Sequence, residues 1–291
     1  MKLIFTEESH QFSFLVYDLE SKSFHKVPLN ENLEDTTTKN RTHYRPFGIT
    51  VHRGEIFVVS NSKLCVFDKD TFEFKRSEYA SINENTHELY SDSKTLWIVD
   101  TSRNRIVATE KTLYGSSERI LTIQSSKNSL PNTRWAYDYN HVNSFAVYKN
   151  DLLVLESNIS NKQREPARLT KLDRNFNLIN KYTLPSDSPH SLKVKEDSLW
   201  FVGSGDGNLH HYDLKSNRVI DKHFICNPRM HWMRGLALFK NLLYIGVGTY
   251  RGVESRKENR ILVFDMTSKR VVDTIYIEGC YSAINQINTL F

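Results

Sequence analysis

Short runs of apolar and β-branched residues recur along this chain, separated by turns that contain Asn, Asp and Ser. Runs of this length with turn residues between them predict β-strands rather than helices. The second run of each group is nearly the same each time, with EIFVV at 55–59, TLWIV at 95–99 and SLWFV at 198–202. A triplet of a variable, a small or polar, and an apolar residue opens each group. Its first residues are Phe47, His87, Asn143, His190, Arg234 and Ser282.

The triplets recur at a mean spacing of 47 residues between positions 47 and 282, which is typical of a repeat architecture. Four strands are expected in each repeat. The last triplet has only an inner strand (281–287) after it, whereas residues 2–28 contain three strands that lack an inner one, so the two ends complete one blade together. We therefore predict an all-β, six-bladed β-propeller of four-stranded blades, with the last blade closed by both termini. The single domain spans 1–291, and its blades cover about 45–79, 86–123, 141–183, 189–224, 233–277, and 281–291 with 2–28.

Composition narrows the class of protein without identifying it. The formal net charge is +5, but Lys and Arg do not form a run, so we expect no nucleic-acid partner. No window approaches the 18 apolar residues of a membrane span, and the N-terminal residues lack the apolar stretch of a signal peptide. Cys65, Cys226 and Cys280 have no metal or disulfide spacing, which favours a reducing compartment. We expect a cytoplasmic monomer.

The candidate site is the mouth of the central channel. The inner strand of each blade lines this channel, and the loops that open on one face carry function in such folds. His141 and Asn143 are two residues apart, so both point to the same side of a strand. The candidate catalytic residues are His87, His141 and His190. The candidate ligand-binding residues are Arg45, Glu88, Asn143, Arg234, Tyr250, Arg251 and Tyr281.

Two chemistries suit these residue types, and each has a simpler alternative. The histidines His87, His141 and His190 could ligate a divalent metal, the one cofactor considered, or they could line a wet channel, since no HxH or HExxH signature is present. The guanidinium of Arg234 suits a carboxylate, sulfate or phosphate, but it could instead pair with Glu88, Glu156 or a backbone carbonyl across the channel. No GxSxG elbow, P-loop or Rossmann fingerprint occurs.

Three segments resemble an uncharacterised bacterial family, a domain of unknown function. They are HVNSFA at 141–146, SPHS at 188–191 continuing through LWFVGSGDGNL at 199–209, and RGLA at 234–237. The family patterns are HxNxxA, PHSPR followed by LWxxxSGxGxL, and RGLA, and the likeness covers roughly the second half of the chain. It departs at Leu192-Lys193, where the family carries Pro-Arg. The family has no established activity. More loosely, the layout is similar to six-bladed propeller lyases, lactonases and sulfotransferases, which use axial His, Asn, Glu or Arg residues.

Two functional hypotheses follow. The first is a propeller that binds a polar, anionic small molecule or glycan at its axial funnel, with His- or metal-assisted chemistry of the hydrolase or lyase type. The second is a non-catalytic propeller that holds a protein or glycan partner on its rim. An enzyme needs a deep polar cluster, whereas an interaction module uses exposed aromatic residues. The sequence predicts deep histidines and aromatic loops, so it leaves both hypotheses open.

Overall fold

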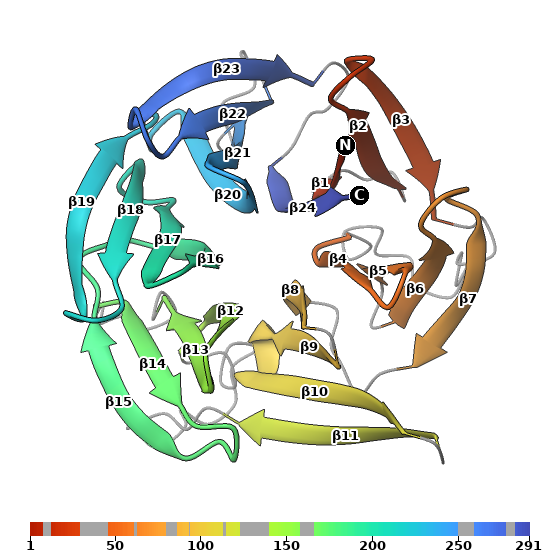
Figure 1. Cartoon of the computed structure of the whole chain (residues 1–291), viewed down its shortest axis with the longest axis horizontal. Coiled ribbons are helices and arrows are strands. Elements are labelled where there is room, and N and C mark those ends of the chain that lie inside the picture. Colours follow the sequence, from red (N-terminus) through yellow and green to blue (C-terminus); the bar gives the residue numbers. More distant parts are fainter. Residues whose placement is uncertain are drawn as a thin grey trace.

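Six four-stranded antiparallel sheets stand around a central axis in the computed structural model (Figure 1). The all-β, six-bladed prediction is therefore confirmed. The structure describes residues 1–7, 13–29, 46–60, 63–79, 86–92, 94–112, 115–122, 140–157, 166–249, 259–277 and 283–291. Within them, no helix has the length and hydropathy needed to cross a bilayer.

The strands take equivalent places in each blade. The inner strands are β4 (Ile49–His52), β8 (Thr86–Ser91), β12 (Val142–Tyr148), β16 (Pro189–Lys195), β20 (His231–Phe239) and β24 (Ile284–Leu290). The second strands are β5 (Glu55–Ser60), β9 (Thr95–Asp100), β13 (Asp151–Glu156), β17 (Ser198–Gly203), β21 (Leu242–Thr249) and β1 (Lys2–Glu7). The third strands are β6 (Lys63–Asp68), β10 (Arg105–Thr112), β14 (Arg168–Leu172), β18 (Asn208–Asp213), β22 (Arg260–Asp265) and β2 (Ser13–Asp18). The outer strands are β7 (Phe74–Tyr79), β11 (Gly115–Thr122), β15 (Leu178–Thr183), β19 (Arg218–Phe224), β23 (Arg270–Tyr276) and β3 (Ser23–Pro28).

Both chain ends lie in the sixth blade, as predicted. The sheet order is β24-β1-β2-β3, and the β1–β24 register runs from Lys2 opposite Leu290 to Thr6 opposite Gln286. The C-terminal strand thus begins at Ile284, later than the expected 281–287. This closure pairs the β1 edge with the end of the chain, so the ring is complete without an exposed inner edge.

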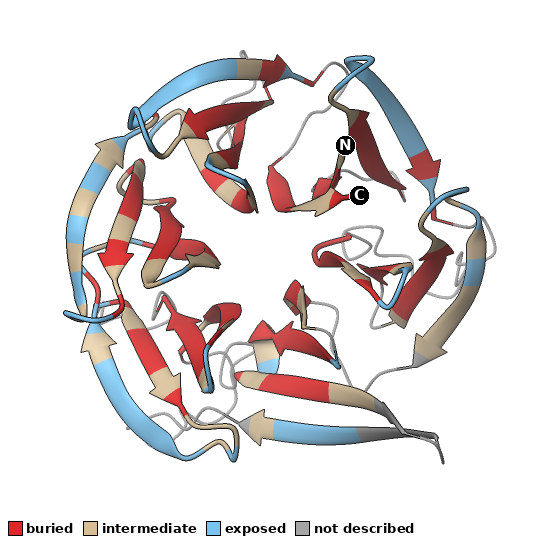
Figure 2. Ribbon diagram, viewed as in Figure 1, coloured by how far each residue is buried: buried red, intermediate tan, exposed pale blue. Residues whose placement is uncertain are grey.

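Apolar side chains fill the space between neighbouring blades. Each of the six interfaces has its own cluster of buried residues. Between the second and third blades, for example, Trp97 stacks on Phe145 with ring centroids 4.6 Å apart. Because a neighbouring blade covers each face of a sheet, the second strands are apolar and buried almost throughout, whereas the outer strands are largely exposed (Figure 2). The exposed face of the outer strands forms the rim.

Hydroxyl groups tie successive blades together near the axis. Thr6 Oγ1 donates to the carbonyl oxygen of Phe47 at 2.5 Å, and Thr101 Oγ1 donates to that of Val142 at 2.6 Å. Ser204 Oγ makes the equivalent bond to the Met233 carbonyl. Each bond joins the region after a second strand to the start of the next inner strand. These bonds fix the backbone from which the axial side chains project.

Candidate functional site

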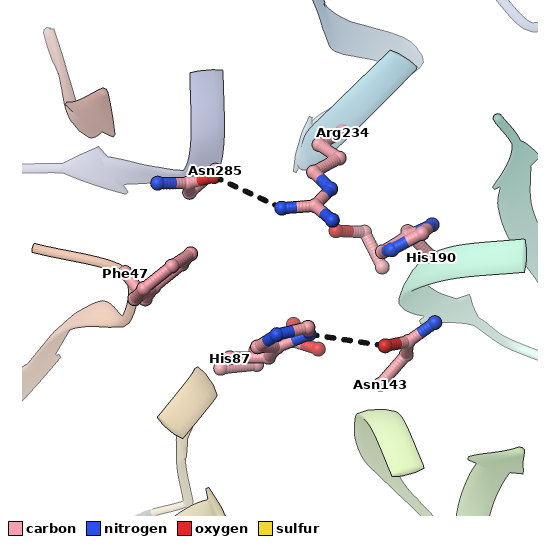
Figure 3. Close-up of a pocket in the computed structure, with 8 residues that line it drawn as sticks. Phe47, His87, Asn143, His190, Arg234 and Asn285 are labelled. Carbon is pink, nitrogen blue, oxygen red and sulfur yellow. Dashed lines mark hydrogen bonds between the residues drawn. The ribbon is translucent and has the colours of Figure 1, made fainter. Parts of the chain in front are cut away.

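A small pocket opens at the axis, where the starts of the inner strands meet (Figure 3). Its roughly 250 Å³ of free space includes open solvent, and the enclosed part has room for about one water molecule, so any molecule bound there must be small. All six blades contribute. The lining residues are Phe47, His87, Glu88, Asn143, His190, Ser191, Arg234 and Asn285.

Bulges in the inner strands account for this convergence. In five blades the inner strand has one more residue than the second strand with which it pairs. The extra residue is His87, Asn143 or Asn285 in three blades, and it lies within the segments 191–192 and 234–235 in the other two. A bulged residue leaves the regular ladder and its side chain is re-aimed. In five inner strands, a polar residue at or next to the bulge therefore faces the axis at the same level.

Gly235 shows why the bulge in β20 needs its particular residue. Its φ is +68°, in the left-handed region that glycine adopts without strain. A Cβ at this position would also lie 3.0 Å from the side chain of Ile287 in β24. The Arg-Gly pair at 234–235 thus lets the inner strands of the fifth and sixth blades approach closely while Arg234 faces the pocket.

The hydrogen bonds of Asn143 assign the tautomer of His87. Asn143 Nδ2 donates to the carbonyl oxygen of Pro189 at 2.9 Å, so its Oδ1 faces His87 Nδ1 at 3.0 Å. An amide oxygen only accepts hydrogen bonds, so Nδ1 of His87 carries the proton. When the ring is neutral, its Nε2 therefore has an unprotonated lone pair.

His190 has the same tautomer for a different reason. Its Nδ1 lies 2.8 Å from the carbonyl oxygen of Ser188, which requires a proton on Nδ1. Ser204 Oγ lies 2.9 Å from the same nitrogen and donates its own proton to Met233. Nε2 of His190 is buried and has no hydrogen-bond partner among the residues that the structure describes. The pocket wall therefore contains a buried acceptor without a donor.

Both imidazoles are neutral at physiological pH. Burial holds the pKa of His87 well below its ordinary value of 6.5, and the neighbouring His141 and Arg234 lower that pKa further. Burial likewise lowers the pKa of His190, helped by the charge of Arg234. The physical cause is the same in both cases, since a second positive charge would be confined with the guanidinium in a poorly solvated space.

The three histidines predicted as metal ligands are neighbours at the axis. The rings of His87 and His190 are stacked, with centroids 6.5 Å apart and planes 20° from parallel, and His141 meets His87 edge-on at 5.1 Å. In the described part of the chain, no three His, Cys, Asp or Glu side chains are grouped to hold a metal ion. Metal binding by these histidines remains a prediction.

Arg234 crosses the pocket from the fifth blade toward the sixth. Its Nη1 donates to Asn285 Oδ1 at 3.3 Å, and its guanidinium carbon lies 5.5 Å from the centroid of the Trp232 ring. Asn285 is held in turn by the bond from its Nδ2 to the Pro46 carbonyl, 3.2 Å long. The guanidinium thus has a neutral amide and an aromatic face beside it, and it remains charged at every accessible pH.

The two glutamates considered as internal partners of Arg234 have other contacts. Glu156 accepts hydrogen bonds from Asn140 Nδ2 at 2.9 Å and from the Thr170 hydroxyl. Lys181 Nζ also lies 3.7 Å from Glu156. The carboxylate of Glu156 is therefore committed within the third blade.

Glu88 lies in the pocket wall, and its nearest cation is Lys193 Nζ at 3.7 Å. Burial raises the pKa of Glu88, and the charge of Lys193 opposes this only in part. Lys193 stands where the resembled bacterial family carries arginine. This lysine is directed to the carboxyl group of Glu88 rather than to an anion in the pocket.

The structure brings together five of the ten predicted site residues, namely His87, Glu88, Asn143, His190 and Arg234. His141 lies next to His87 but does not line the pocket. The catalytic and ligand-binding roles of these six residues remain predictions. The other four lie outside the described residues: Arg45, Tyr250, Arg251 and Tyr281.

Sequence reasoning missed Asn285. The repeat was aligned on Ser282, which lies outside the described residues, but the bulge in β24 places Asn285 at the level of His87 and Asn143. The available signal was the pair Asn285-Gln286, which puts two polar residues between apolar ones in a strand close to the axis.

The sequence matches no family model and no curated protein, so the resemblance to the bacterial family remains a prediction. Several solved structures are similar. One is from the crystal structure of a nidogen/laminin complex, with 11% identity, a TM-score of 0.67, and 100% of this chain and 98% of that chain covered. A protein of unknown function from Bacteroides caccae has 12% identity, a TM-score of 0.66 and coverages of 99% and 98%. The β-propeller domain of Myceliophteria thermophila Cps50 (Swd1) has 11% identity and a TM-score of 0.59, and the match covers 99% of this chain and 86% of that chain. At these identities the likeness shows the fold alone.

Proposed function

We propose that the axial pocket binds a small anionic molecule, with Arg234 as the group that holds its charge. The observation that supports this proposal is the set of groups that surround the guanidinium in the pocket. Its neighbours in the pocket are two histidines held neutral by a lowered pKa and the amides of Asn143 and Asn285. Among the described residues of the wall, Glu88 has the one carboxyl group, and Lys193 lies beside it. An anion would therefore meet one positive charge surrounded by oriented dipoles.

The chemistry that this pocket can add to binding is proton transfer. His87 and His190 present unprotonated Nε2 atoms beside the guanidinium, and a neutral imidazole in that form can accept a proton from a bound molecule. The lowered pKa makes each ring a weaker base but keeps it unprotonated at neutral pH. A His-based reaction of the lyase or hydrolase type fits this arrangement better than a metal-assisted one.

The cytoplasm is the proposed location, on the basis of the thiols. Cys65 and Cys226 are free and buried, and burial raises the pKa of each to about 11. Unpaired cysteines in a folded chain suit a reducing compartment.

Calorimetric titration with acetate, propionate, sulfate and phosphate tests the binding proposal. Arg234→Lys keeps the charge but loses the planar fork. A charge-assisted hydrogen bond contributes about 1.5–3 kcal/mol, so this variant should bind the preferred anion about ten- to a hundred-fold more weakly. Arg218→Lys, at an exposed position on the outer strand β19, is the matched control and should bind like the wild type. Equal affinity of all three proteins would show that Arg234 belongs to the scaffold.

The alternative function, a rim that holds a macromolecular partner, draws on exposed apolar side chains of the outer strands. Leu178, Phe224 and Tyr276 are 59%, 69% and 63% exposed. They lie on three successive blades, β15, β19 and β23. A partner on this rim would be indifferent to Arg234→Lys, so the same variant separates the two functions.

A further inference from the structure

The hydrogen-bonding groups of the pocket indicate that its ligand has a hydrogen-bond donor as well as a negative charge. His87 and His190 each use the Nδ1 proton on the protein itself, at 3.0 Å to Asn143 Oδ1 and 2.8 Å to the Ser188 carbonyl. Each ring can then offer the pocket only an acceptor, the Nε2 lone pair. The guanidinium of Arg234 offers only donors. A ligand that satisfies both sides needs an anionic acceptor and, close to it, a hydrogen-bond donor.

Of the two imidazole acceptors, Nε2 of His190 gives the stronger indication that the ligand has a hydrogen-bond donor. The side chain is 4% exposed, and its Nε2 is buried without a partner in the described portion of the chain. A buried polar atom without a hydrogen bond costs about 1–3 kcal/mol. A ligand that donates a hydrogen bond to this Nε2 atom would remove that cost.

The donor should be a hydroxyl group rather than an ammonium. A cationic donor would lie beside the guanidinium of Arg234, in the same poorly solvated space where His87 and His190 resist protonation. A hydroxyl group donates one proton without adding charge. The small enclosed space of the pocket also limits the molecule to a few heavy atoms, so donor and anion must be close together.

We infer that the pocket is built for a small α-hydroxy acid, whose carboxylate binds Arg234 and whose hydroxyl group donates to Nε2 of His190 or His87. This inference rests on the proposed function, because it specifies the anion that Arg234 holds. A carboxylate with a hydroxyl group on the adjacent carbon is a compact arrangement that supplies both an acceptor for the guanidinium and a neutral donor for an imidazole.

Three ligands of equal carbon number test the inference by calorimetric titration at pH 7.5. Lactate has the carboxylate and the hydroxyl group, propionate has only the carboxylate, and alanine replaces the hydroxyl group by an ammonium. We expect lactate to bind at least ten-fold more tightly than either of the others. His190→Asn keeps an amide donor near the place of Nδ1 but lacks the Nε2 acceptor. It should reduce the preference for lactate over propionate to less than three-fold.

His87→Asn is the second variant and answers the same question if His190→Asn does not fold, as judged by circular dichroism. If propionate binds the wild type as tightly as lactate does, the inference is wrong while the anion-binding proposal stands. The inference also fails if alanine equals lactate, or if the lactate preference survives in both variants. If none of the three carboxylates binds, the inference is wrong, and the titration with sulfate and phosphate then decides whether the proposed function fails as well.

Discussion

Acid should destabilise this protein through the two pocket histidines, and the size of the effect follows from their environment. His87 and His190 stay neutral in the folded state because burial and Arg234 lower their pKa, whereas in the unfolded chain each ring returns to its ordinary pKa of 6.5. Above pH 7 both states are neutral and the rings contribute no pH dependence. As the pH falls below 6.5, the unfolded chain takes up protons that the folded chain does not, so the folded state loses stability.

The expected loss can be worked out for one pH unit. Between pH 6 and pH 5, a group with a pKa of 6.5 in the unfolded state and no proton in the folded state changes the free energy of unfolding by about 1 kcal/mol, which is the upper limit for each ring. The two rings together give at most about 2 kcal/mol, a large part of the roughly 5–15 kcal/mol by which domains are stable. Burial raises the pKa values of the carboxyl groups of Glu88 and Asp100, so the effect of the rings is measured as a difference between two proteins that both contain these groups.

Urea unfolding at pH 7, 6 and 5, followed by circular dichroism at constant ionic strength, measures this effect. The double variant His87→Asn, His190→Asn is the comparison. It retains His52 and His211, whose pKa values burial also lowers, so their contributions cancel. The wild type should lose up to about 2 kcal/mol more than the variant between pH 6 and 5, with equal denaturant slopes. A difference between the two proteins that stays constant over this range would mean that the folded state protonates the rings, and the argument for neutral acceptors would be refuted.

Two further predictions concern the scaffold around the pocket. Gln286 is buried, accepts from the backbone N–H groups of Ile49 at 2.8 Å and Leu89 at 3.1 Å, and donates to the Leu89 carbonyl. Gln286→Leu should therefore lower the free energy of unfolding in urea by about 2–5 kcal/mol, since it leaves buried amides without partners; a loss below 0.5 kcal/mol would contradict this role. Deleting residues 284–291 removes β24 and leaves the β1 edge unpaired, so the shortened chain should aggregate in light scattering; a monomer that melts like the parent would contradict the importance of closure.

The sequence alone determined the architecture. The repeat of apolar strands and polar turns, together with the missing inner strand at one end and the surplus one at the other, was sufficient to predict six blades and their closure. It also placed the first residue of each triplet near the axis, which the structure bears out for Phe47, His87, Asn143, His190 and Arg234. These features depend on alternation and period, which are local properties of the chain that a reader can count.

The tertiary structure alone decided what the axial residues can do. Bulges arise from the pairing of one strand against another, so no count along the chain could show that Asn285 faces the pocket. The tautomer of His87 depends on Asn143 in the next blade, and the partner of Glu88 is Lys193, two blades away. Hydrogen bonds and charges act between groups that the fold brings within a few ångströms, whatever their separation in sequence. The protonation, pairing and orientation of these side chains are therefore properties of the closed ring.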